Sequence, residues 1–299
     1  MSKIIYKLLF ISVIILCNFS NCYSQNNTPS IMVIPSNNEA IDEYEKNINY
    51  SILIQAIEMA LIERGFTPLS LENEITNMQE VSPLSTQECI KNILQNNTAE
   101  IFVKVNASFK DYDKFTTSLK IQLSAVESVS SMIFSREMLN SGDWPTSTDW
   151  NITIPNVLNY DGFIDHFISK MQMNITQKGR GVKLIITKDQ NSIVSMDDVT
   201  LETNQTIEEL LTNWIEGKSI NDIIFKEVDP DQRLSELNRY ESNIIRIPFF
   251  PSGEEHYSIN RFSRDVRKSL ARIYNQTNDK KIRPPRIHIS GAVIKLTLP

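Results

Sequence analysis

The sequence contains little glycine, cysteine and histidine, and each shortage excludes a class of functional site. Only 8 of the 299 residues are glycine, and neither of the glycine-rich phosphate-binding patterns, G-x-x-x-x-G-K-[ST] and G-x-G-x-x-G, occurs. The nucleophile motif G-x-S-x-G is also absent. The three histidines lie far apart, without the i, i+4 spacing of a helical metal site. The sequence therefore predicts no cofactor, no metal and no recognisable catalytic residue.

The first residues have the pattern of a secretory signal peptide. Lys3 and Lys7 form a basic n-region, and they are followed by an apolar run, Leu8 to Cys17, which is too short to cross a bilayer. We expect cleavage after Ser24, so that residues 1–24 form the signal peptide. The mature protein is then exported, to the periplasm or the exterior, and has no transmembrane segment. Lipid attachment at Cys22 and association with the outer membrane are alternatives that the sequence leaves open.

Cleavage after Ser24 changes both the cysteine content and the charge of the chain. Two of the three cysteines are removed, so that Cys89 is left without a disulfide partner and is expected to be a small buried hydrophobic residue. Two lysines and no acidic residue are removed, so the net charge falls from −6 to −8. The mature chain must therefore be stabilised by an ordinary hydrophobic core.

The spacing of apolar residues predicts both helices and strands. Two helices begin with S/T-x-x-E capping boxes, at Ser85 with Glu88 and at Thr206 with Glu209. Gly291 lies where the last strand changes its apolar phase, which predicts a bulge or a tight turn. Helices are predicted around residues 50–65, 85–94, 160–171, 206–217 and 259–273, and strands around 31–34, 101–109, 119–125, 182–186, 244–250 and 286–298.

The order of these elements predicts two domains of an α/β (α+β) class. Residues 177–181, "QKGRG", contain two of the eight glycines and form the best candidate linker. They separate an N-terminal domain, residues 25–176, from a C-terminal domain, residues 182–299. Each domain is expected to have a mixed or antiparallel sheet with helices packed on one face. The second domain resembles a split βαβ arrangement.

The first half of the chain resembles the small α/β domain of the Tol-system propeller protein and of the curli-secretion and lipoprotein-activator families. The resemblance covers about residues 29–137. It is carried by the strand "IMVIP", by the helix leading to "RGFTPLSL", and by the strands within "AEIFVKVNASF" and "SLKIQLSAVESVSSMIFS". It implies a domain that acts by docking with another component of the cell envelope.

Residues 29–299 also resemble a family of exported proteins of Bacteroidota that form a domain of unknown function. The shared features are a "P-x-I-M-V-x-P" opening, a long helix ending in "RGF", and a late "R-I-P" strand, here Arg246–Pro248, before a basic helix. Many members carry a Trp-Cys pair soon after the first strand, where this sequence has Asn37 and Asn38. The resemblance implies an export route and a fold, and it implies no activity.

The stretch "PSIMVIPSNNEA", Pro29 to Ala40, has the form of a buried strand that opens into a loop. Such loops hold phosphate groups in many α/β proteins, but they require glycines, and this loop contains none. Ser36 and the two asparagines are therefore expected to cap a helix or to turn the chain.

Two features are candidates for binding. The first is a basic stripe on the last predicted helix, formed by Arg261, Arg264, Lys268 and Arg272, opposite an apolar face. The second is the segment "SGDWPTSTDW", residues 141–150, which is expected to be a loop that carries Trp144 and Trp150. An exposed tryptophan stacks on sugars or anchors a partner, whereas a buried one belongs to the core.

These features predict a non-enzymatic exported protein that docks with an envelope protein or with an anionic component of the envelope. An acidic pI of about 5.3 argues against nucleic acid as the partner. The alternative is a secreted hydrolase that acts on cell-wall or dietary glycan. The 36 acidic residues allow many carboxylate pairs, and sequence alone does not place any two of them together.

Overall fold

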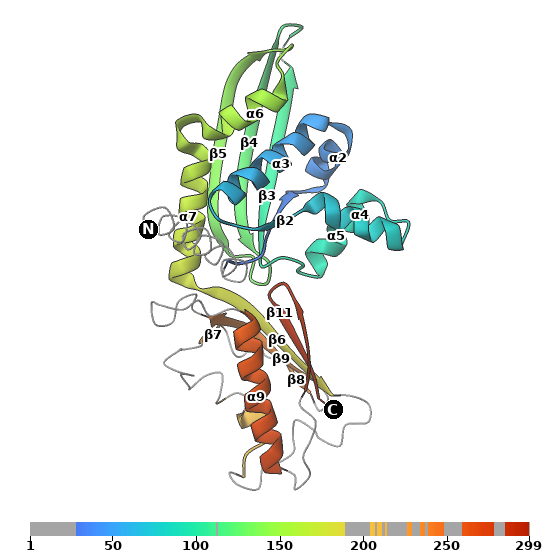
Figure 1. The fold of residues 1–299 in the computed structure, drawn as a ribbon, viewed down its shortest axis with the longest axis vertical. Helices are drawn as coiled ribbons and strands as arrows, with labels where there is room; N and C mark the ends of the chain where they lie inside the picture. The colour runs from blue at the N-terminus through green and yellow to red at the C-terminus, as the bar shows by residue number, and fades with distance from the viewer. Residues whose placement is uncertain are drawn as a thin grey trace, which may run out of the picture.

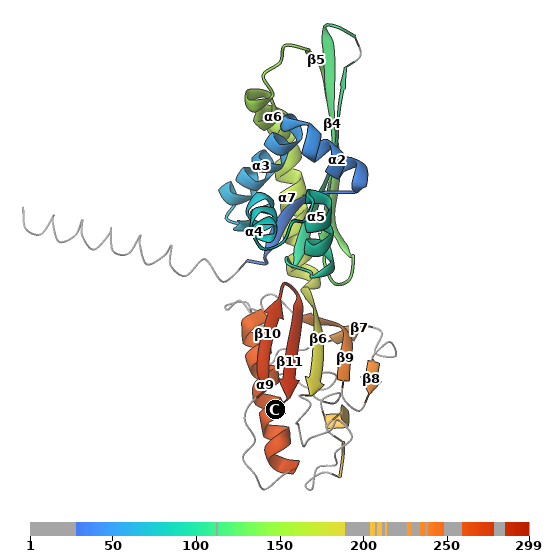
Figure 2. The ribbon, with the colours of Figure 1, turned by 90° about the vertical axis from the view of Figure 1, so that its right-hand side faces the viewer.

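The chain folds around two β-sheets, which lie one above the other in Figures 1 and 2. The computed structural model describes residues 28–111, 113–188 and 285–298, with shorter segments at 204–206, 208–210, 213, 226–228, 234–236, 239–247 and 259–277. The predicted signal peptide and Cys22 lie outside the described residues. The predicted α/β (α+β) class is confirmed, because each sheet packs against helices.

The first sheet has the strand order β2-β1-β3-β4-β5, with β1 parallel to its two neighbours and β3, β4 and β5 antiparallel to one another. Its strands are β1 (Ile31–Pro35), β2 (Pro68–Leu69), β3 (Ile101–Asp111), β4 (Thr116–Glu127) and β5 (Ile133–Pro145). Its helices are α2 (Asn38–Lys46), α3 (Ile48–Glu63), α4 (Leu71–Val81), α5 (Thr86–Gln95), α6 (Trp150–Asn159) and α7 (Phe163–Lys178).

Both faces of β1 are buried, as its continuous apolar run predicts. Ile31 and Val33 point into a large core shared with α3, α6 and α7, whereas Met32 and Ile34 point into a smaller core under α4 and α5. Helices on a single face were therefore the wrong expectation for this sheet. Because successive side chains of a strand alternate between faces, a strand that is apolar at every position requires cover on both sides.

The second sheet has the order β10-β11-β6-β9-β7, and β8 also pairs with β9. Its strands are β6 (Arg180–Lys188), β7 (Lys226–Val228), β8 (Leu234–Glu236), β9 (Arg239–Ile247), β10 (Arg286–Ser290) and β11 (Val293–Leu298), and α9 (Ile259–Thr277) packs on one face. β6 is parallel to β11 and antiparallel to β9, and β11 is antiparallel to β10. β9 and β10 therefore run in the same direction, with α9 between them in the chain and two strands between them in the sheet, which is a split βαβ arrangement.

The predicted linker at residues 177–181 is much shorter in the structure. α7 continues to Lys178 and β6 begins at Arg180, so that only Gly179, with φ of 68°, lies between them. Two of the five predicted linker residues therefore belong to a strand. The physical reason is tertiary: Arg180 and Gly181 bind carboxylates of the first sheet, as described below.

Several local signals of the sequence are confirmed. Ser85 and Glu88 form a reciprocal capping box at α5, and the backbone N–H groups of Thr206 and Glu209 bind each other's side chains at 2.9 and 3.1 Å. Asn37 caps α2 with its side chain, as expected for the loop after β1. Cys89 is a residue of α5 and is fully buried, and this burial raises the pKa of its thiol.

The predicted helix around residues 160–171 begins later than expected. Tyr160–Gly162 form a short 3₁₀ turn, in which Asp161 has a left-handed φ of 48°, and α7 begins at Phe163. On α7 itself, Asp165 forms an ion pair with Arg64 at the end of α3. Gly162 and Gly179, both with positive φ, thus flank α7 at its two ends.

The phase change near Gly291 is a turn between two strands. β10 and β11 form a hairpin in which Ser290 is paired with Val293, and Gly291 has φ of 52°. A Cβ atom at Gly291 would lie 1.7 Å from the Asn97 carbonyl oxygen, in the loop before β3. Glycine is therefore required there for two reasons, the backbone conformation and the close approach of the first sheet's loop.

Glu58 provides a test of the packing between α3 and α4. Partial burial raises the pKa of Glu58 from 4.5 to about 7; the backbone N–H of Leu71 opposes this rise and the charge of Glu72 adds to it. The folded protein therefore binds this proton more tightly than the unfolded chain does. The stability from this group is complete below about pH 4.5 and is lost as the pH rises through about 7.

We expect Glu58→Gln to leave the free energy of unfolding nearly unchanged at pH 4.5 and to raise it by about 1 kcal/mol at pH 8. The full pKa shift of Glu58 would correspond to a larger change in the free energy of unfolding. The expected change is smaller because the Glu58 carboxyl keeps partial contact with water. Urea unfolding at both pH values measures it, with the exposed Glu45→Gln as control. An equal effect of Glu58→Gln at the two pH values would contradict the assignment.

Candidate functional site

The exposed face of α9 carries the predicted basic stripe. Phe262, Val266 and Leu270 are fully buried in the second core, and they fix the rotation of the helix. Arg264, Lys268 and Arg272 are exposed on the other side, whereas Arg261 is half-buried. The exposed three follow one another at i, i+4 and i+8, so they form a row about 12 Å long. We call Arg264, Lys268 and Arg272 the α9 row.

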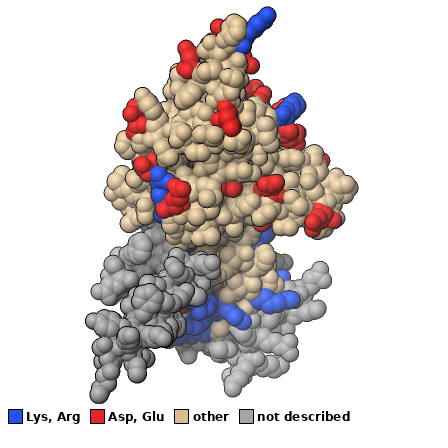
Figure 3. All heavy atoms as spheres, turned by 45° about the horizontal axis from the view of Figure 1, so that its top comes forward, with Lys and Arg blue, Asp and Glu red and all other residues tan. Residues whose placement is uncertain are grey.

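The charge around the α9 row contrasts with that of the first sheet's helices. α9 has five basic residues and one acidic residue, whereas residues 38–95, which contain α2 to α5, have ten acidic and three basic residues. Figure 3 shows this contrast on one face: acidic side chains are scattered over the first sheet's helices, and basic side chains gather below them. The two halves of the molecule therefore differ in electrostatic potential.

The two candidate tryptophans do not lie in an exposed loop. β5 continues to Pro145 and includes Trp144, which is half-buried, packs against the first core and donates its ring N–H to the Ser141 carbonyl at 3.1 Å. Trp150 is the first residue of α6 and is 8% exposed, with its ring edge-to-face against Phe109 at 5.3 Å. Only residues 146–149 of the predicted loop lie outside helices and strands, because β4 extends far enough to pair with residues 143–145 and α6 begins at Trp150.

A polar pocket of about 440 Å³ lies beside Trp150. Its wall includes the carboxylates of Asp111 and Asp149, and the remaining lining is mostly asparagine and threonine. One oxygen of Asp149 accepts bonds from the backbone and side-chain nitrogens of Asn151, at 3.0 and 3.1 Å, because Asp149 caps α6. Asp149 is therefore engaged in capping the helix, and the Trp150 ring is buried, so that it has no free face on which a sugar could stack.

The two sheets are joined by buried ion pairs. Glu100, just before β3, accepts a bond of 2.9 Å from Arg180 at the start of β6, and the side chains of both residues are nearly inaccessible to water. Burial raises the pKa of Glu100, and the positive charge of Arg180 opposes this rise. Burial also lowers the pKa of Arg180. Each charge therefore depends on the other for its stability in this site.

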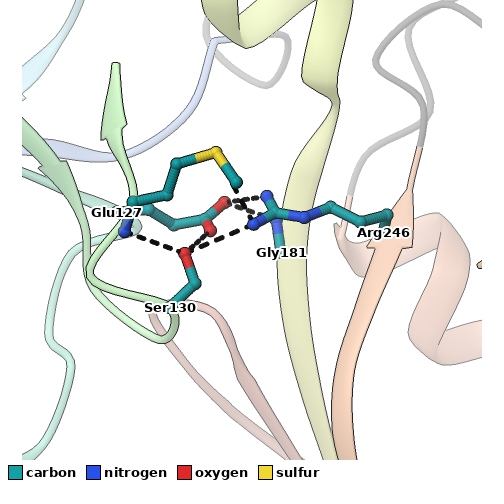
Figure 4. Close-up of polar contacts among 5 residues, drawn as sticks. Glu127, Ser130, Gly181 and Arg246 are labelled. Carbon is teal, nitrogen blue, oxygen red and sulfur yellow. Dashed lines mark hydrogen bonds and ion pairs between the residues drawn. The ribbon is translucent and has the colours of Figure 1, made fainter. Parts of the chain in front are cut away.

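A second carboxylate, Glu127 at the end of β4, binds two strands of the second sheet (Figure 4). One oxygen accepts from the Gly181 backbone N–H at 2.6 Å and from the Arg246 guanidinium at 2.8 Å. Its other oxygen accepts from the Ser130 hydroxyl, which in turn accepts from Arg246 at 3.3 Å. A Cβ atom at Gly181 would lie 2.8 Å from the Glu127 carboxylate, so this contact requires a residue without a side chain.

The β10–β11 hairpin adds a third contact between the sheets. The Ser290 hydroxyl donates to the Asn96 carbonyl at 3.0 Å, and Gly291 lies against Asn97. Together with the two carboxylate sites, this contact connects the first sheet to β6, β9 and the β10–β11 turn. We call the group formed by Glu100, Glu127, Arg180 and Arg246 the junction.

The sequence contained signals for the junction that spacing alone did not reveal. Glu100 lies just before one apolar strand and Glu127 lies just after another. The alternation of apolar and polar residues along these strands does not require the side chains at their ends to be exposed to water. Arg246 was noticed as part of the "R-I-P" motif, without a role. The structure gives it one, because it is the partner of Glu127.

The described residues contain no group of three or more His, Cys, Asp and Glu side chains placed to hold a metal ion. Within the same part of the chain, no helix has both the length and the apolar character required to cross a bilayer.

Comparison with known proteins adds little. No protein-family model matches the chain, and no curated protein matches it either. Among solved structures, it is similar to the crystal structure of lipoprotein GNA1162 from Neisseria meningitidis, with 10% sequence identity and a TM-score of 0.29 over 50% of this chain and 99% of that one. At this TM-score the similarity supports no conclusion about fold or function.

The junction leads to a prediction about stability. We expect Glu100→Leu to lower the free energy of unfolding by about 3–5 kcal/mol, because it leaves the Arg180 charge buried without its carboxylate. The double change Glu100→Leu with Arg180→Met should recover most of this loss, since apolar side chains of similar size replace both charges. Urea unfolding of the single and double variants measures both effects. A loss below about 1 kcal/mol in the single variant would show that the pair is not desolvated as described.

Proposed function

We propose that the protein is an exported, non-enzymatic docking module, and that the α9 row binds an acidic surface of another envelope protein. The observation that carries this proposal is the α9 row itself: three exposed cations in line on a helix that the second core holds in place. The signal peptide and the resemblance to the Tol-type domain support the location. A row of fixed cations favours association with an acidic patch, both in rate and in orientation.

A protein partner is favoured over a lipid surface. Helices that lie on membranes insert an apolar face among the acyl chains. The apolar face of α9 is instead buried against its own sheet. The exposed side of α9 carries the charged residues of the α9 row and so offers no apolar face for insertion. The free edge of the first sheet is compatible with docking, because β5 pairs only with β4 in the described part of the chain.

Charge reversal of the α9 row tests the proposal. We expect Arg264→Glu with Lys268→Glu to preserve the fold, since both side chains are exposed, and to reduce crosslinking to envelope proteins in intact cells at least about tenfold, through like-charge repulsion at the interface. Mass spectrometry of tagged mature protein identifies and quantifies the crosslinked partners.

Lys46→Glu with Lys91→Glu is the matched control, because it reverses two exposed helix charges on the first half of the molecule. Circular dichroism verifies that each variant is folded. Undiminished crosslinking of the α9 variant would contradict the proposal. Binding of wild-type protein to anionic vesicles, lost in the same variant, would assign the α9 row to a lipid surface instead.

The pocket beside Trp150 is the one observation that favours the alternative, a glycan hydrolase with acidic catalysts. Asp111, at the end of β3, and Asp149, at the start of α6, both line this pocket. We expect Asp111→Asn with Asp149→Asn to leave docking unchanged, and to preserve α6, since asparagine caps a helix as well as aspartate does. Release of reducing sugars from cell-wall glycan by wild-type protein, lost in this double variant, would support the hydrolase.

A further inference from the structure

The outer face of the first sheet contains a second cavity, distinct from the α9 row and from the pocket at Trp150. It is a groove of about 340 Å³ over β3, β4 and β5, on the face opposite the large core. Figure 2 shows this part of the sheet nearly edge-on, with α3, α6 and α7 on one side. A volume of this size is at the lower end of the range for small-molecule sites.

The floor of the groove contains a straight row of polar residues across three strands. Lys104 on β3 is paired with Ser124 on β4, and Ser124 is paired with Arg136 on β5. Directly paired residues of antiparallel strands have their Cα atoms about 5 Å apart, so the Cα atoms of Lys104 and Arg136 lie on either side of Ser124, about 10 Å from each other. Both side chains are long enough to reach a single group above Ser124.

Hydrogen bonds in the groove prepare it for an acceptor. The Arg136 guanidinium donates to the Ser124 hydroxyl at 3.3 Å, which leaves the hydroxyl hydrogen of Ser124 available to a ligand. The Ser36 hydroxyl oxygen, at the rim after β1, is enclosed and has no hydrogen-bond partner among the described residues. A buried hydroxyl without a partner is uncommon, and a bound polar group would satisfy it.

The charge of the groove is unusual for this chain. None of its lining residues is acidic, although the chain as a whole has a net charge of −6. Lys120 lies on the same face of β4, four residues before Ser124, and adds a third positive charge to this face. Next to the cations, Val126 and Ile133 are paired across β4 and β5 and form an apolar wall.

We propose that this groove binds a small organic anion with a phosphate or carboxylate head and a short apolar tail. The head lies above Ser124 between Lys104 and Arg136, where a guanidinium can donate two parallel bonds to an oxyanion. The tail lies against Val126 and Ile133. Neither the signal peptide nor the α9 row requires such a site, so the proposal is independent of the docking function.

Binding of hexyl phosphate, hexanoate and 1-hexanol to the ¹⁵N-labelled mature protein tests the site. The three compounds have similar apolar tails. Hexyl phosphate and hexanoate carry different anionic head groups, whereas 1-hexanol is neutral. We expect either anion, or both, to bind with a dissociation constant on the order of a millimolar and to shift the amide signals of Ser36, Asn106, Gln122 and Ser124. The tighter of the two identifies the preferred head. 1-Hexanol should cause no saturable shift at these residues.

Variants assign the binding to the groove. Lys104→Gln and Arg136→Gln should each weaken binding of the anions at least about fivefold, whereas Lys91→Gln, an exposed lysine on α5, should have no effect. Val126→Ser should weaken hexyl phosphate but not inorganic phosphate. Shifts spread over the surface, equal binding of 1-hexanol, or equal loss in Lys91→Gln would overturn the proposal. Circular dichroism of each variant separates lost binding from lost folding.

Discussion

The arrangement of this molecule depends on two carboxylates buried at the ends of neighbouring strands. Glu100 and Glu127 face the second sheet from β3 and β4, which are paired at Ile101 and Glu127. Two negative charges this close could not be buried without compensation, and Arg180 and Arg246 supply it. Because the arginines come from adjacent strands, β6 and β9, both sheets are fixed at the same place.

The junction also explains the local chain path between the sheets. Gly181 donates its backbone N–H to Glu127, and the absence of a side chain lets β6 approach the carboxylate. The same contact explains why the chain needs only Gly179 between α7 and β6. A flexible linker would have left the two sheets free to move, whereas a strand that begins inside the junction does not.

A fixed junction leaves the two candidate binding surfaces to act separately. The α9 row belongs to the second core, and the groove at Ser124 belongs to the outer face of the first sheet. Both collect positive charge on a chain whose net charge is negative, while residues 38–95, which contain α2 to α5, have ten acidic and three basic residues. Such a separation of charge orients a molecule relative to its partners more than it strengthens any single contact.

The sequence by itself determined the features that depend on neighbours in the chain. The buried strand at Ile31, the capping box at Ser85, the turn at Gly291 and the outward direction of Arg264 all follow from local periodicity and local hydrogen bonding. Only the tertiary structure decided which distant residues meet. The partners of Glu127 lie 54 and 119 residues away, and the row through Ser124 depends on strand register, which no single strand encodes. The turn-forming residues around Trp150 likewise predicted a loop. Its burial is decided by packing against Phe109, which is distant in the sequence.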